Sequence, residues 1–269
     1  MKKYVTFLFL SSLILISCRI DDSPINDSYP TTISRLSDTK LNEAIIEYEN
    51  LNDFYICTQL NEYGFPEYGL SHCLGRPILR EEINKDESEL LNMAEAVILK
   101  NKKFTGVADV SRLSIRRSTG SKGCIKCDDS DGDIKNIKWI FDFNNQLYEG
   151  LEVFNTQIRA VLDNNGVFML SGNWYPHISV PKTNLYSLEQ IKEDLVGQKR
   201  TIYCWTNYGI AVTEDNFPSE AGKVIIPIEK EYEIELRVAW EIIISGAYYV
   251  FYVDVVSGEI IMEQQLIIC

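Results

Sequence analysis

The stretch LRVAWEIII, residues 236–244, places an apolar side chain at every second position over the length of a strand. Residues 249–253, YVFYV, repeat this period through Tyr249, Phe251 and Val253. Because successive side chains of a strand point to opposite faces of a sheet, the period predicts two half-buried strands. DVVSG, residues 254–258, then predicts a turn into a third strand over residues 259–268.

A second group of strands is predicted upstream. Residues 137–143, IKWIFDF, alternate with the same period. Residues 157–163 and 167–170 flank the tripeptide NNG, residues 164–166. Because Asn and Gly tolerate positive φ, this tripeptide predicts a tight hairpin.

Three helices are predicted from caps and from apolar spacing close to 3.6 residues. Ser37 is an N-cap candidate for the first, residues 86–100 form the second, and the capping box SLEQ, residues 187–190, opens the third. The side chains expected to face the core are Leu41, Ala44, Ile45, Tyr48, Leu51, Leu90, Met93, Ala94, Val97, Leu188, Ile191 and Leu195.

Strands and a few helices without strict β-α-β alternation favour an α+β fold, with helices laid on antiparallel sheets. One helix precedes each group of strands, which suggests two similar units, residues 85–180 and 185–269. Residues 37–84 are expected to form an N-terminal helix and an irregular region closed by a disulfide.

The N-terminus combines a basic start, MKK, with an uncharged apolar run over residues 4–16. This pattern is typical of a secretion signal. The following LISC, residues 15–18, resembles the lipobox of bacterial lipoproteins. The resemblance implies that residues 1–17 are removed, that Cys18 is lipidated, and that the protein is anchored in the bacterial cell envelope, at the outer membrane or cell surface. Residues 18–36 are polar and are expected to be a flexible tether.

The charge of the chain limits the classes of partner. The formal net charge is −13, and removal of Lys2 and Lys3 with the signal brings it to −15 (−13 − 2). Such a protein repels phosphate backbones, so no nucleic acid partner is expected. Membrane attachment is expected through the lipid and not through a basic patch.

Six cysteines remain after Cys18, an even number that suits disulfides in an oxidising compartment. Sequence proximity suggests the pairs Cys57–Cys73 and Cys124–Cys127, which leaves Cys204–Cys269. The alternative for the CIKC motif at residues 124–127, a redox or metal site, is disfavoured because acidic residues follow it and no second CxxC is present.

The hairpin VLDNNGV, residues 161–167, and the exit GNWYP, residues 172–176, resemble thermolysin-type propeptides (FTP domains). The sequences at 186–191, 236–242 and 248–261 resemble the adjoining PepSY unit. The resemblance covers about 100 residues, from Gln157 to Gln265, with residues 201–230 as an insertion, and its motifs are structural. It implies two PepSY/cystatin-like units and a protease partner, whereas the protease domain itself is missing.

No enzyme and no cofactor are expected. The two histidines, His72 and His177, are too far apart for a His-Glu-x-x-His zinc helix. Ser71 and His72 are adjacent, but Cys73 stands where a nucleophile elbow needs glycine.

Two further groups of residues have the chemistry of ligand sites. No metal site is expected: the acidic loop with Asp129, Asp131 and Asp133 lacks the EF-hand's final acid and is interpreted as a solvated loop, with a weak, irregular cation site as the alternative. Trp174 and Trp205 lie near turns and are the ligand-binding candidates, although core burial is the common fate of such residues.

The expected function is therefore that of a lipid-anchored envelope binding protein that resembles a free-standing metalloprotease propeptide. The partner of this protein would be an envelope or secreted protein. The most specific version of the expected function is inhibition or regulation of a protease. The alternative is a surface lipoprotein that captures a glycan or a peptide.

Overall fold

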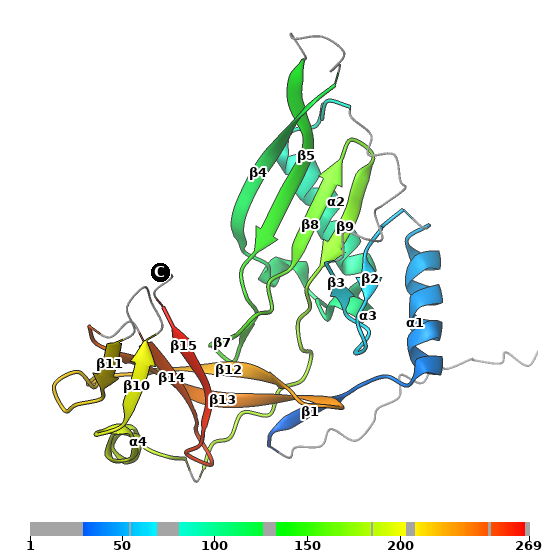
Figure 1. The fold of residues 1–269 in the computed structure, drawn as a ribbon. Helices are drawn as coiled ribbons and strands as arrows, with labels where there is room; N and C mark the ends of the chain where they lie inside the picture. The colour runs from blue at the N-terminus through cyan, green and yellow to red at the C-terminus, as the bar shows by residue number, and fades with distance from the viewer. Residues whose placement is uncertain are drawn as a thin grey trace, which may run out of the picture.

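The computed structural model describes residues 29–53, 55–68, 81–125, 133–183, 185–202, 208–246 and 249–266. The signal peptide, Cys18, Cys73, Cys127, Cys204, Cys269, Trp205, Asp129 and Asp131 lie outside the described residues. Two sheets form the body, one above the other in Figure 1. The architecture confirms the predicted α+β class with predominantly antiparallel strands.

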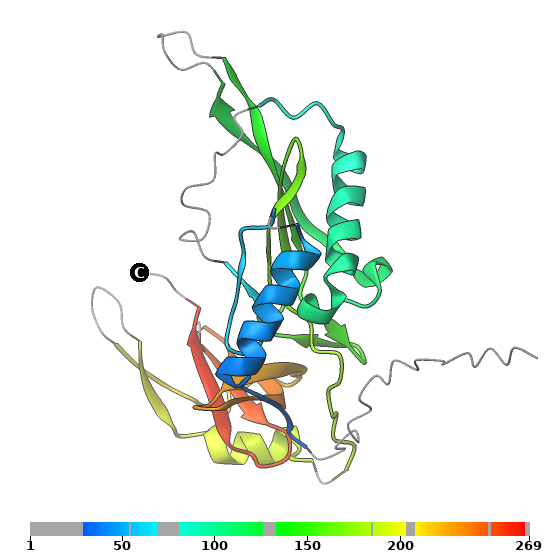
Figure 2. The same cartoon turned by 90° about the vertical axis from the view of Figure 1, so that its right-hand side faces the viewer.

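The upper sheet has four antiparallel strands in the order β4-β5-β8-β9. Helix α2 packs along one face of it, as Figure 2 shows. Short helices α3 and η2 follow α2, and α1 packs beside the same core. The bounds are β4 (Ile115–Cys124), β5 (Ile134–Phe143), β8 (Arg159–Asp163), β9 (Gly166–Ser171), α1 (Asp38–Leu51), α2 (Glu87–Lys100), α3 (Lys102–Thr105) and η2 (Val110–Arg112).

The lower sheet has seven strands in the order β15-β14-β13-β12-β7-β6, with β1 also paired to β13. Its β12–β7 pair is parallel. Helix α4 packs on it through Ile191 and Leu195. The bounds are β1 (Thr31–Ser34), β6 (Leu147–Tyr148), β7 (Leu151–Val153), β12 (Gly222–Glu229), β13 (Glu233–Ile244), β14 (Tyr249–Asp254), β15 (Ile260–Gln265) and α4 (Leu188–Leu195).

Two small hairpins complete the described elements. Strands β2 (Gln59–Leu60) and β3 (Pro66–Glu67) pair with each other, as do β10 (Lys199–Ile202) and β11 (Tyr208–Ala211). The predicted helices and caps are confirmed: Ser37 accepts a bond from the Lys40 amide, and both bonds of the Ser187–Gln190 capping box are present. The twelve side chains predicted to face the core all pack there.

Three sequence-based expectations need correction. Residues 31–34 of the predicted tether form β1, a strand of the lower sheet, in which Ile33 pairs with Ile234 and packs against the same apolar cluster. The predicted boundary between units near residue 180 does not follow the sheets, because β6 and β7 belong to the lower sheet. The predicted insertion contains β12, which pairs with β13 from Gly222↔Glu241 to Glu229↔Ile234.

The physical reason is the same in each case: these strands are specified by their neighbours more than by their own period. Strand β1 has only four residues and one inward apolar side chain. Strand β12 carries Pro227, which normally argues against a central strand. Strand β7 pairs with Val224 and Ile225 only, so among the described residues Pro227 lies where β12 has one paired neighbour.

Buried tyrosines of the lower sheet predict alkaline destabilisation. Burial and the hydrogen bond to Glu263 raise the pKa of Tyr249 to about 12, and burial with the nearby Glu241 raises that of Tyr252 to about 12. Unfolded tyrosine has a pKa of about 10. As pH rises from about 10 to 12, the unfolded chain loses protons that the native state retains, so the free energy of unfolding falls.

Denaturant unfolding at about pH 9 and about pH 11 measures this effect. The Tyr249→Phe variant is the control, because one titrating group is removed, and its stability should fall less steeply between the two pH values. Equal slopes for the variant and the unchanged protein would contradict the assignment.

Candidate binding edge

The outer side of β4, here called the β4 edge, is an open edge of the upper sheet. Strand β4 pairs with β5 from Ile115↔Phe143 to Cys124↔Ile134, and no other described strand pairs with it. In Figure 1 β4 lies at the outer border of the sheet. An unpaired edge of ten residues presents backbone N–H and C=O groups to an incoming strand.

The opposite border of the same sheet is covered. Around β9, the amide of Cys57 donates to the Phe168 carbonyl at 2.9 Å, and the Leu170 amide donates to the Thr58 hydroxyl at 2.9 Å. The Gly172 amide donates to the Pro66 carbonyl at 2.9 Å. The segment from Cys57 to Pro66 therefore occupies one border, which leaves β4 as the border available for strand addition.

Two register shifts interrupt the β4–β5 ladder, one between Ile115 and Arg117 and one between Ser121 and Lys122. At the first, Arg116 is the extra residue. Bulges of this kind increase local twist and limit indiscriminate pairing of an edge. The two irregularities therefore increase the local twist of β4 and oppose flat edge-to-edge stacking.

Charged side chains line the β4 edge. Arg117 lies 3.3 Å from Asp142, and Arg159 donates to the same carboxylate at 2.5 Å. The hydrogen bond to Asp142 raises the pKa of Arg159. Arg112 donates to the Leu147 carbonyl at 2.8 Å. Arg116 and Lys122 are exposed, and their side chains make no hydrogen bond or ion pair with another described residue.

The border of the lower sheet at β15 differs in its chemistry. Glu263 on β15 is bound by Arg200, with 2.8 Å between Arg200 Nη2 and Glu263 Oε1, and by the hydroxyl of Tyr249. Burial opposes ionisation of Glu263, but these two hydrogen bonds prevail and lower its pKa. At this border the Glu263 carboxylate therefore already has hydrogen-bond donors from Arg200 and Tyr249.

The structure places the remaining predicted site residues as follows. Cys57 and Cys124 are each disulfide-bonded, while their predicted partners lie outside the described residues, so the pairing stays a prediction. Asp133 is exposed and lies 3.8 Å from Lys135. His177 is exposed.

Trp174 does not form the ligand platform that its position near a turn predicts. Its side chain is 4% exposed and belongs to the upper core, so no sugar ring can stack on it. Its amide donates to the Thr105 carbonyl at 2.6 Å, and Gly106 packs against its backbone. The strand exit turns inward here, which the nearby turn residues did not reveal.

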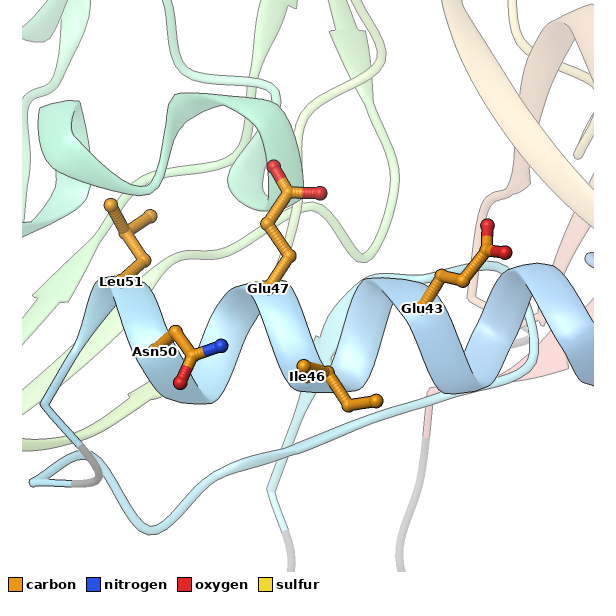
Figure 3. Close-up of a pocket in the computed structure, with 5 residues that line it drawn as sticks. All are labelled: Glu43, Ile46, Glu47, Asn50 and Leu51. Carbon is orange, nitrogen blue, oxygen red and sulfur yellow. The ribbon is translucent and has the colours of Figure 1, made fainter.

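Two cavities lie elsewhere. One of about 620 Å³ runs along α1, and its five described lining residues all come from that helix, as Figure 3 shows. One of these, Glu47, forms an ion pair with Lys103. A second, of about 390 Å³, lies between the end of α1, α2 and the β8–β9 hairpin. The first lacks polar groups that converge from several elements, as a small-molecule site requires.

Sequence reasoning missed the β4 edge because residues 115–124, IRRSTGSKGC, show no apolar alternation. A usable signal was present: residues 112–126 carry basic side chains and no acidic one, in a chain with 39 acidic and 26 basic residues. In the described part of the chain, no group of three metal-ligating side chains lies together, and no helix is long and apolar enough to cross a membrane.

No protein-family model matches the chain, and no curated protein matches it. Among solved structures, the chain is similar to the C-terminal domain of YpeB from Bacillus megaterium, with a TM-score of 0.30 and 12% sequence identity. The similarity covers 87% of this chain and 99% of the other.

Proposed function

We propose that the protein is a lipid-anchored binding protein of the bacterial cell envelope, which captures an extended segment of a partner protein by strand addition at the β4 edge. The observation that carries this proposal is the asymmetry of the upper sheet: its β9 border is covered by the segment from Cys57 to Pro66, whereas β4 pairs with β5 alone among the described strands. Strand addition supplies affinity through main-chain bonds and specificity through side chains.

The described part of the body begins at Tyr29, eleven residues after Cys18 (29 − 18). The Tyr29 hydroxyl donates to Asp254 at 2.7 Å and accepts from the Val238 amide at 3.0 Å. These contacts join the start of the body to β13 and β14. A lipid on Cys18 would therefore hold the lower sheet near the membrane by a short connection, with the upper sheet farther along the body.

The sharpest form of the proposal is inhibition or regulation of a metalloprotease, because protease clefts also bind extended chains. Capture of a peptide is the second form and uses the same edge. Capture of a glycan is less well supported, because Trp174 is buried.

Site-specific cross-linking tests the proposal. A photo-reactive phenylalanine analogue is placed at Thr119 on β4, with the same group at Gln264 on β15 as the matched control, in cells that carry the full chain. The expected result is a cross-link from position 119 alone, to one continuous extended segment of a partner protein. Cross-links from position 264 only, or from neither position, would contradict the proposal.

Inhibition is tested separately on purified protein against a panel of envelope metalloproteases. Slowed cleavage that is lost when a blocking peptide occupies β4 supports the inhibitor form. An unchanged rate across the panel rejects that form and leaves peptide capture as the function tested by cross-linking.

A further inference from the structure

The charge of the β4 edge is opposite to that of the whole chain. The formal net charge is −13, yet residues 112–126 contain five basic residues and no acidic one. Arg112, Arg116, Arg117 and Lys122 are the described members of this basic strip, and all four are exposed. Such a local field favours an oppositely charged partner during encounter.

The four cations are not equivalent. Arg117 is partly neutralised by Asp142, and Arg112 is held by the Leu147 carbonyl. The side chains of Arg116 and Lys122 have no ionic or hydrogen-bonding partner in the described part of the chain. They lie near the two ends of β4, so a strand laid along the edge passes both of them.

A second copy of the chain does not fit this edge. In an antiparallel pair of β4 strands centred on Thr119, Arg116 of one copy faces Lys122 of the other. Like charges directly opposite each other destabilise a pair. No other register of two β4 strands pairs a basic side chain with an acidic one, since no acidic side chain occurs between residues 112 and 126.

Apolar side chains flank the basic ones. Ile115, at the start of β4, is 42% exposed, and Ile134, paired with Cys124 at its other end, is 66% exposed. Ile115 lies on β4 itself and is available to an apolar side chain of an added strand, whereas Ile134 lies on β5, one strand further in. A strand that alternates acidic and apolar residues would match both the charge of the β4 edge and the exposed Ile115.

We infer that the segment captured at the β4 edge is an acidic, extended polypeptide, recognised through Arg116 and Lys122. This inference rests on the proposed strand addition and specifies its partner. Charge selects the segment, and the outward backbone groups of β4, with which no described strand pairs, hold it.

Binding of synthetic peptides to the purified full chain tests the inference. The probe is a ten-residue peptide of alternating valine and glutamate, which matches the length of β4. Matched peptides replace glutamate with glutamine or with lysine. The expected affinity order is glutamate, then glutamine, then lysine, and the glutamate peptide should bind more weakly as salt rises.

Variants then locate the contact. Arg116→Gln and Lys122→Gln should each weaken binding of the glutamate peptide about two- to fivefold at low salt, the range for exposed ion pairs. Lys230→Gln is the matched control, because Lys230 is an exposed cation at the β12–β13 turn, and it should bind as the unchanged protein does.

The outcomes separate this inference from the proposed function. Equal affinity for the glutamate and glutamine peptides, with unaffected Gln variants, overturns the acidic preference while strand addition stands. No peptide binding, together with no cross-link at Thr119, overturns both. If the protein binds phosphatidylglycerol vesicles but not the glutamate peptide, the basic strip binds an anionic lipid surface, and the inference is also overturned.

Discussion

The Asp254→Ala variant is expected to lose about 3–5 kcal/mol of unfolding free energy, as removal of one partner from a buried charged network does. Asp254 is fully buried at the end of β14. Its carboxylate accepts from the Tyr29 hydroxyl at 2.7 Å and from the amides of Val256 and Ser257 at 2.8 Å each, and it lies 3.5 Å from Arg237. The substitution leaves the amides of Val256 and Ser257 without this acceptor, while Arg237 keeps its bond to Glu235 and the Tyr29 hydroxyl keeps the Val238 carbonyl at 3.2 Å as an acceptor.

The loss should be local as well as global. Because Tyr29 joins the N-terminal segment to β13, hydrogen exchange in Asp254→Ala should accelerate more in β1 than in β5 and β8. Tyr29→Phe is the matched control, with an expected loss of about 1.5–3 kcal/mol for one hydrogen bond to a charged group. A change below about 1 kcal/mol in Asp254→Ala would contradict this role.

The second large effect is expected at Asn101. Asn52 and Asn101 end helices α1 and α2 and exchange side-chain bonds in both directions, at 2.8 and 2.9 Å. Each amide also donates to a helix carbonyl, Tyr48 for Asn52 and Val97 for Asn101. Both are buried. Asn101→Leu should cost about 2–4 kcal/mol of unfolding free energy. The buried Asn52 side chain then loses both of its hydrogen bonds to Asn101 and keeps the one to the Tyr48 carbonyl.

A double-mutant cycle isolates the pair. In Asn52→Leu/Asn101→Leu the two unpaired amides are both gone, so the double variant should be more stable than the sum of the single losses predicts. Recovery stays partial since the Tyr48 and Val97 carbonyls lose their donors. Strictly additive losses, measured by denaturant unfolding, would show that the two amides do not act as a pair.

Elements with strong local signals were predictable from the sequence. Helix α2 begins at the Asp86 capping box and keeps one apolar face, and the NNG tripeptide closes the β8–β9 hairpin with Asp163 opposite Gly166. Strands that depend on neighbours were not. Strand β1 is short, β12 contains Pro227, and β4 is polar along most of its length.

The candidate site was less predictable than the fold. Edge status depends on sheet order, which no local pattern of residues 115–124 encodes. The burial of Trp174 depends on the close approach of Gly106, where an added Cβ would lie 2.0 Å from the Trp174 carbonyl oxygen. The basic residues between 112 and 126 can be counted in the sequence. That they lie on an edge strand follows only from the order of strands in the sheet.

Hydrogen–deuterium exchange of the full chain with and without the valine–glutamate peptide tests strand addition most directly. If the peptide pairs with β4, amides between Ile115 and Cys124 should exchange more slowly in the complex, while those of β15 exchange at an unchanged rate. Slower exchange at β15, or no change in β4 at a peptide concentration that saturates binding, would contradict the account.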